Sequence, residues 1–175
     1  ENLEWLWGYR ENDRLGGHDP YSASKASAEM VFSAYARSFF VDRPTLGAAS
    51  TRAGNVIGGG DWALDRIIPD CVRAIESEKS IELRNPSATR PWQHVLEPLS
   101  GYLLLAASLR KEPLGFVGSW NFGPSPKEVR TVLEVAEHLV ARFGRGRINC
   151  ESRNKNPHEA LLLQLQIARV LIVYR

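Results

Sequence analysis

The sequence predicts an α/β protein with a mainly parallel sheet. Segments with the apolar spacing of amphipathic helices alternate with short strand-like runs along the chain. The 175 residues are 43% hydrophobic and 24% charged, which is typical of a globular chain that buries the core of about one domain. The sequence has neither internal repeats nor low-complexity tracts, so this alternation is the main guide to the fold.

A long amphipathic helix is expected from Tyr21 to about Phe40. Asp19 suits the N-cap, and Pro20 suits the first helical position. Apolar side chains recur at intervals of three and four residues, at Ala28, Val31, Phe32, Tyr35 and Phe39. This stripe is expected to face either a sheet or a partner subunit.

A strand, a glycine-rich loop and a second helix are expected next. The strand runs from Thr45 to Arg52 and ends at AGNVIGGGDWA, whose glycines allow sharp turns. The glycine triplet 58–60 is either a ligand loop or only a flexible turn, because it does not match the phosphate-binding pattern G-x-G-x-x-G. The helix runs from Asp65 to about Glu76, with Pro69 tolerated in its first turn.

Four more elements complete the predicted alternation. Ile81–Arg84 and Gly118–Phe122 are expected strands. Val95–Leu109 is a strongly apolar helix, expected to be buried between other elements. Thr131–Phe143 is expected to be a helix with one apolar face.

The charge pattern and the cysteines narrow the class of protein. A formal net charge of +2, with both signs interspersed, argues against a surface for nucleic acid or membrane. Cys71 and Cys150 are far apart and there is no Asn-x-Ser/Thr sequon, which favours a reducing compartment, the cytoplasm. No apolar run is long enough to cross a bilayer, no signal peptide precedes the first motif, and both chain ends are expected to be cuts.

The histidines predict no metal site. They have no ligand spacing with the two cysteines, and His158-Glu159 lacks the second histidine of a zincin. The histidines are His18, His94, His138 and His158. Each is expected to be a polar surface or loop residue.

Tyr21 and Lys25 are the strongest candidates for chemistry. Residues four apart lie one helical turn apart on the same face. A lysine ammonium lowers the pKa of a nearby phenol from its reference of roughly 10, which prepares the phenol to act as a base. The spacing alone also fits a surface lysine beside a half-buried tyrosine.

Several stretches in order carry a resemblance that covers almost the whole chain. They are YRENDRLGGHDPYSASKASAE, RAGNVIGGGDWALDRIIPDCVRAI, LRNPSATRPWQHVLEPLSGYLLLA, SWNFGP and the weaker NPHEALLLQLQ. The sequence resembles the extended short-chain dehydrogenase/reductase family, and within it the CDP-glucose 4,6-dehydratases. Residues beyond about Gln166 depart from that pattern.

The resemblance implies a partial Rossmann-like, doubly wound parallel sheet that lacks its N-terminal glycine-rich half, plus a small substrate-binding α/β subdomain. Residues 1–60 are then expected to belong to the NAD-binding domain and to carry the Tyr/Lys pair. Residues 61–175 are expected to form mainly the nucleotide-sugar-binding region, with the chain crossing back to the Rossmann core.

The resemblance also implies the cofactor and the reaction. With NAD, Tyr21 is expected to take the proton of the glucose C4 hydroxyl while NAD takes the hydride. Water then leaves across C5 and C6, and the hydride returns to C6, in a pathway of deoxysugar biosynthesis for lipopolysaccharide O-antigen. Lys25 is expected to bind the nicotinamide ribose, and Arg52 and Asn55 are further expected cofactor contacts.

CDP-glucose is the expected substrate, with Asn55, Arg66, Arg90 and Asn121 as its contacts. The planar guanidinium of Arg90 suits a diphosphate, although Pro91 stands where related enzymes have aspartate. The alternatives are an exposed loop arginine at position 90 and a turn asparagine bonded to its own backbone at position 121. For Trp92, core packing is favoured over stacking on a ligand.

The stretch before residue 1 is expected to hold the family's glycine-rich turn and Thr-Asp-Lys segment. The resemblance also implies that the whole protein is a homo-oligomer, a dimer or tetramer, packed through the Tyr21 helix. The alternatives are another nucleotide-sugar epimerase or dehydratase, or a non-catalytic fragment for substrate binding or subunit contact. The chain alone is expected to be inactive and poorly soluble.

Overall fold

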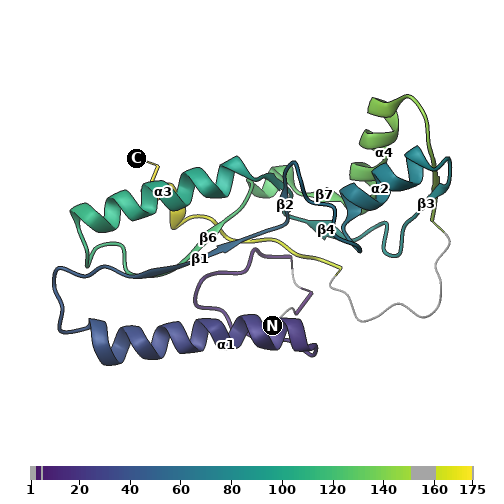
Figure 1. Ribbon diagram of the computed structural model, residues 1–175. Coiled ribbons are helices and arrows are strands. Elements are labelled where there is room, and N and C mark those ends of the chain that lie inside the picture. The colour runs from purple at the N-terminus through teal and green to yellow at the C-terminus, as the bar shows by residue number, and fades with distance from the viewer. Residues whose placement is uncertain (1–2, 5, 151–160, 175) are drawn as a thin grey trace.

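Three layers build the larger part of the molecule (Figure 1). The computed structural model describes residues 3–4, 6–150 and 161–174. Its middle layer is the parallel pair of β1 (Ala49–Ala53) and β6 (Gly118–Phe122), with Ala49 opposite Gly118 and Ala53 opposite Phe122. Helix α1 (Pro20–Tyr35) covers one face and α3 (Leu96–Lys111) covers the other. Helices on both faces of a parallel pair confirm the predicted α/β class.

Helix α1 begins as its sequence predicts and continues to residue 40 in a different form. Asp19 is the N-cap and accepts a hydrogen bond from the Ser22 N–H at 2.9 Å, and Pro20 follows it. The last turn, Ala36–Phe40 (η1), has π-helical bonding. Most of the predicted apolar stripe points away from the sheet, since Val31, Tyr35 and Phe39 are all more than half exposed.

Helix α3 is less buried than its composition predicts. Its contact with the sheet is close because Gly101 has no side chain, and a Cβ there would lie 2.3 Å from Phe122 Cε1. Leu105 is buried on the same side, whereas the opposite side exposes a row of leucines. These are Leu96, Leu99 and Leu103. A helix on an outer layer, apolar on its exposed side as well as its buried side, therefore replaces the expected helix buried between other elements.

The three-layer part has its own core between α3 and the strands. Leu105, Trp120 and Phe122 form it together with two residues of the C-terminal stretch, Val170 and Val173. The short 3₁₀ helix η3 (Val170–Ile172) carries the first of these. The stretch that departs from the resemblance thus packs into this core.

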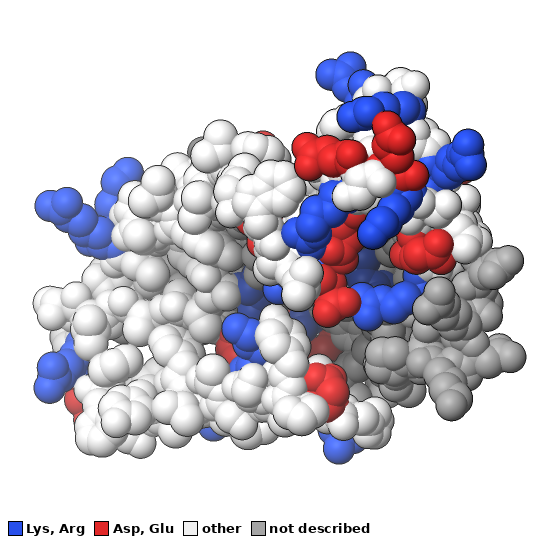
Figure 2. All heavy atoms as spheres, turned by 45° about the vertical axis from the view of Figure 1, so that its right-hand side comes forward, with Lys and Arg blue, Asp and Glu red and all other residues white. Residues whose placement is uncertain are grey.

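A smaller lobe holds a second core. It contains α2 (Ile67–Glu76), α4 (Val132–Phe143) and the parallel pair of β3 (Ser80–Glu82) and β8 (Arg147–Asn149). Its buried residues are Cys71, Ile75, Ile81, Leu83 and Ala136. Figure 2 shows acidic and basic side chains mixed over this lobe, whereas most of the remaining surface in that view is uncharged.

Two helices of this lobe test the predicted boundaries. Helix α2 begins at Ile67 instead of Asp65, because Asp65 has a positive φ of 61° and Arg66 is extended. Helix α4 matches its prediction closely. Thr131 caps it in a capping box with Glu134, and Gly144 ends it in the left-handed conformation.

Very short strand pairs join the two parts. β2 (Val56–Ile57) pairs in parallel with β5 (Gln93–His94), and β4 (Thr89–Arg90) pairs antiparallel with β7 (Arg130–Thr131). A fifth short element, the 3₁₀ turn η2 (Pro126–Glu128), precedes β7. The predicted boundary at residue 60 stays a prediction, since residues 61–175 contribute to both cores. Among the described residues, no helix is long and apolar enough to span a membrane.

Candidate functional site

The predicted Tyr21/Lys25 pair lies at the start of α1 with the expected geometry. Lys25 Nζ is 5.4 Å from the centroid of the Tyr21 ring. Tyr21 is 67% exposed, so it is not the half-buried tyrosine of the alternative interpretation. The amide and hydroxyl of Ser22 bond to Asp19 and hold the pKa of that carboxyl below its usual range. The charged cap stabilises the turn that carries the phenol.

The N-terminal end of α1 lies at the carboxyl end of β1 (Figure 1). Open α/β sheets bind ligands at this edge. Asn55 follows β1 here, is half-buried, and accepts a hydrogen bond from the Gln93 N–H through its backbone carbonyl at 2.9 Å. The loop after β1 is therefore fixed against the segment that contains Arg90.

A close backbone approach brings three predicted substrate segments together. A Cβ on Gly54 would lie 2.5 Å from Pro91 Cγ, so only glycine fits beside this proline. The Gly54 N–H donates to the Phe122 carbonyl at 3.2 Å, and Gln93 Nε2 donates to the same oxygen at 3.1 Å. The segments that carry Asn55, Arg90 and Asn121 meet at this point.

Arg90 is buried on β4, so the alternative of an exposed loop arginine at this position is wrong. The residue is only 6% exposed, and its Nη1 donates to the Thr89 carbonyl at 2.8 Å. Pro91 is buried in the place of the family's aspartate. The neighbouring Trp92 is half-buried and donates from Nε1 to the Arg130 carbonyl at 3.2 Å, which fixes the edge of this segment.

Asn121 lies inside β6, so it is not the turn asparagine of the alternative interpretation. It is 1% exposed, and its Nδ2 donates to the Tyr9 carbonyl at 2.9 Å and to the Gln166 carbonyl at 3.4 Å. Its backbone N–H donates to Glu11 Oε1 at 3.1 Å. Within the described part of the chain its Oδ1 has no hydrogen-bond partner. Asn121 thus binds two segments that are distant in sequence, one around Tyr9 and one around Gln166, to strand β6.

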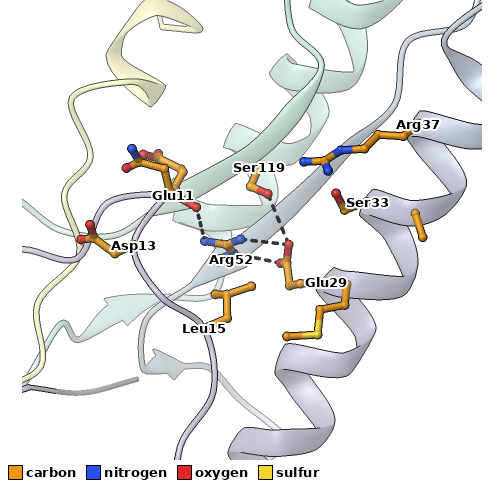
Figure 3. A pocket seen from close by; sticks show the side chains of 11 residues that line it. Glu11, Asp13, Leu15, Glu29, Ser33, Arg37, Arg52 and Ser119 are labelled. Atoms are coloured by element: carbon orange, nitrogen blue, oxygen red, sulfur yellow. Dashed lines mark hydrogen bonds and ion pairs between the residues drawn. The ribbon is translucent and has the colours of Figure 1, made fainter.

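Arg52 is held by α1. Its Nε and Nη2 donate to the two carboxylate oxygens of Glu29 at 2.9 and 3.0 Å, and Nη1 donates to the Glu11 carbonyl at 3.0 Å (Figure 3). Ser50 and Ser119 also donate to Glu29. The Arg52 guanidinium and these hydroxyls hold the pKa of the Glu29 carboxyl below its usual range.

An open groove of about 460 Å³ lies beside this ion pair (Figure 3). Neither Tyr21 nor Lys25 lines it. Its walls come from the segment before α1, from α1 and from both strands: Glu11, Asn12, Asp13, Leu15, Glu29, Met30, Ser33, Ala34, Arg37, Arg52 and Ser119. The sequence predictions did not include Glu29, although its spacing of four residues from Lys25 places it on the same face of the helix.

Arg66 is exposed at the N-cap of α2. In the glycine triplet, Gly58 packs on Val95, where a Cβ would lie 2.8 Å from Cγ1, and Gly60 has a φ of 84°. Packing and backbone conformation therefore account for two of the three glycines. Within the described ranges, no three His, Cys, Asp or Glu side chains form a metal-binding group. His158 lies outside them.

Comparison with known proteins adds independent findings. Residues 8–118 match the NAD dependent epimerase/dehydratase family. A CDP-glucose 4,6-dehydratase of Salmonella typhimurium is 47% identical over 173 residues, which cover 97% of this chain and 48% of the relative. An Arabidopsis thaliana trifunctional UDP-glucose 4,6-dehydratase/epimerase/reductase is 30% identical over 139 residues, 79% of this chain and 19% of the relative. The chain thus spans about half or less of these relatives.

Solved structures share the fold at low identity. A dTDP-glucose 4,6-dehydratase from Bacillus anthracis in complex with NAD has a TM-score of 0.77 at 22% identity, over 97% of this chain and 50% of that one. A UDP-glucuronic acid 4-epimerase from Bacillus cereus, in complex with a fluorinated sugar nucleotide and NAD, has a TM-score of 0.80 at 16% identity, over 97% and 51%. Both likenesses support the Rossmann-like fold.

Proposed function

Because the chain belongs to the NAD dependent epimerase/dehydratase family, we propose that it is part of a CDP-glucose 4,6-dehydratase. The 47% identity to such an enzyme over 97% of the chain carries this proposal. The Tyr21/Lys25 pair at the ligand-binding edge of the sheet supplies a proton acceptor where the reaction needs one. The product would be CDP-4-dehydro-6-deoxyglucose and water.

Tyr21 is proposed as the base that takes the proton of the sugar C4 hydroxyl. Its exposure leaves the phenol open to a ligand. The Lys25 ammonium, on the same face of α1, stabilises the negative charge that develops on the phenol oxygen. A fixed helix start keeps the two groups one turn apart throughout the reaction.

The residues present fit the nicotinamide end of NAD. An exposed phenol and an ammonium on one face of α1 can donate to ribose hydroxyls. NAD, when bound, takes up and returns the hydride of this reaction. The chain contains no G-x-G-x-x-G sequence, so the pyrophosphate site is proposed to lie in a stretch found in the longer relatives.

The substrate is proposed to lie where the segments of Asn55, Arg90 and Asn121 meet. Arg90 can grip two diphosphate oxygens through a planar guanidinium. Asn121 fixes the segments at this place, since its amide donates to two backbone carbonyls. Arg66 is proposed to reach the nucleotide from the start of α2, and direct contact of Asn55 and Arg52 with the cofactor stays a prediction.

Isothermal titration of this chain with CDP-glucose, with and without NAD, tests the proposal. We expect CDP-glucose binding that weakens at least tenfold in Arg90→Lys, which keeps the charge but loses the two-point grip. Arg145→Lys, outside the converging segments, is the matched control. Equal binding of CDP-glucose and UDP-glucose by the chain would contradict the CDP assignment.

Activity is tested on a chain extended at its N-terminus to the length of the relatives. Mass spectrometry should show conversion of CDP-glucose to a product lighter by one water, with NAD recovered unchanged. A product of unchanged mass would instead support an epimerase, the alternative function.

The protein is proposed to act in the cytoplasm, since Cys71 and Cys150 are both free thiols.

A dimer or tetramer is proposed for the whole protein, packed through α1. The exposed side of this helix is apolar, with Val31, Tyr35 and Phe39 in one stripe. The rings of Tyr35 and Phe39 lie 5.2 Å apart and form a continuous surface. A second copy of the helix would cover it.

A further inference from the structure

Glu29 has both carboxylate oxygens occupied. Oε1 accepts from Arg52 Nε, and Oε2 accepts from Arg52 Nη2, Ser50 and Ser119. The side chains of Glu29 and Arg52 are 16% and 20% exposed, so the pair is partly shielded from water. The carboxylate is therefore turned toward the strands and fixed there (Figure 3).

Lys25 stands between two possible partners on α1. Tyr21 lies four residues before it and Glu29 four residues after it, and side chains at this spacing are neighbours on a helix. A free carboxylate attracts an ammonium more strongly than a neutral phenol ring does. In the structure, however, Lys25 Nζ lies over the Tyr21 ring at 5.4 Å, and no described ion pair joins it to Glu29.

We propose that Arg52 occupies the Glu29 carboxylate and so keeps the Lys25 ammonium beside Tyr21. Arg52 and Glu29 are then positioning residues for the Tyr21/Lys25 pair, and neither needs to touch a ligand. This inference rests on the proposed function only in that Tyr21 is taken to be the catalytic base. The arrangement of the four side chains is independent of it.

The other charged groups near Glu29 do not replace Arg52. Glu11 and Asp13 line the same groove and carry the same sign as Glu29, and Asp13 is paired with Arg10. Arg37 also lines the groove, but its backbone lies eight residues after Glu29, or about 12 Å along the helix axis. Loss of Arg52 therefore leaves Lys25 as the cation one helical turn from Glu29 on the same face of α1.

Proton NMR of this chain tests the inference without cofactor or substrate. The Lys25 ε-methylene protons should resonate upfield because they lie near the Tyr21 ring, and Tyr21→Leu supplies the reference without a ring. In Arg52→Met we expect the loss of roughly half or more of this displacement, since Lys25 turns to the freed Glu29. In the double variant Glu29→Gln/Arg52→Met the displacement should return.

Arg52→Lys is the conservative control, because it keeps a cation at the carboxylate. It should retain the upfield position, while thermal unfolding of every variant reports the state of the fold. A purely structural role predicts equal displacement in all folded variants, and this result would overturn the inference. If Arg52→Met does not fold, Arg52→Gln replaces it, because it keeps hydrogen-bond donors at the carboxylate but no charge. Loss of displacement in Arg52→Gln supports the inference, and a displacement equal to that of the unsubstituted chain overturns it. Absence of dehydratase activity would affect only the proposed function.

Discussion

Tyr21 is the residue on which the proposed chemistry depends. Its hydroxyl makes no hydrogen bond to the described residues, and the side chain is exposed, so Tyr21→Phe should leave the thermal unfolding temperature unchanged. Turnover of CDP-glucose by the extended chain should fall by about 100-fold or more, since a positioned base contributes that much. Tyr35→Phe, also exposed on this helix, is the control. Equal activity in the two variants would refute the base assignment.

Cys71 and Cys150 should differ sharply in reactivity. Burial, followed by the nearby Asp70 charge, raises the pKa of the Cys71 thiol to about 11, from 9.0. A thiol-specific reagent at neutral pH should modify exposed Cys150 in the folded chain and Cys71 only after unfolding, as peptide mass spectrometry would show. Rapid labelling of Cys71 in the folded chain would mean that the smaller core opens easily.

The same thiol gives a pH dependence. Because the folded pKa lies above the unfolded one, the stability due to neutral Cys71 is complete below about pH 9 and is lost between about pH 9 and 11. Urea unfolding across this range should show a decline that Cys71→Ala reduces and Cys150→Ala does not. Parallel curves for all three proteins would contradict it.

At the scale of elements, the cap of α1 links stability to the site. Asp19→Ala removes the acceptor for the Ser22 N–H and hydroxyl, so the first turn should fray and the unfolding temperature should fall. Asp19→Asn keeps a capping oxygen, so its unfolding temperature should be close to that of the unsubstituted chain. Circular dichroism during heating measures both. An unchanged transition in the alanine variant would show that tertiary contacts alone hold this end.

The close contact of α3 with the sheet predicts that a glycine-to-alanine substitution will lower the stability of the protein instead of raising it. Glycine to alanine inside a helix normally stabilises it by up to about 1 kcal/mol. Gly101→Ala should instead destabilise the protein by about 1–3 kcal/mol, because the new methyl group would meet Phe122 and the Tyr174 hydroxyl. Gly59→Ala, where nothing lies within 4 Å, is the control in urea unfolding.

Sequence patterns predicted the long elements well and the short ones poorly. Strand β6 has the expected bounds and helix α4 begins one residue later than expected, because a bounded apolar run and a capping box mark them. The two-residue strands β2, β4, β5 and β7 are too short for a periodic signal. Burial of α3 was overestimated because composition does not show which side of a helix is covered.

The candidate site was predictable where chemistry lies along one helix. The spacing of Tyr21 and Lys25 predicts that they share one helical face, and the family resemblance singles them out, but the closeness of Asn55, Arg90 and Asn121 depends on tertiary contacts such as Gly54 against Pro91. Those contacts join residues that are distant along the chain, so no local pattern reveals them.

For the whole molecule, two exposed apolar surfaces predict self-association. One is the α1 stripe, and the other is the leucine row of α3. Sedimentation velocity of the chain should show species larger than a monomer. Val31→Glu/Tyr35→Glu should reduce association through α1, and Leu99→Glu/Leu103→Glu should do so through α3. A monomer at all concentrations would remove support for packing through α1.

The two separate cores have a further consequence for how the chain unfolds. They share no buried residue, and the strand pairs β2–β5 and β4–β7 that lie between the two parts are only two residues long. Cooperative unfolding of two parts as one depends on packing that crosses between them. The two parts are therefore expected to lose their packing as separate cooperative units, which hydrogen exchange would report as two levels of amide protection.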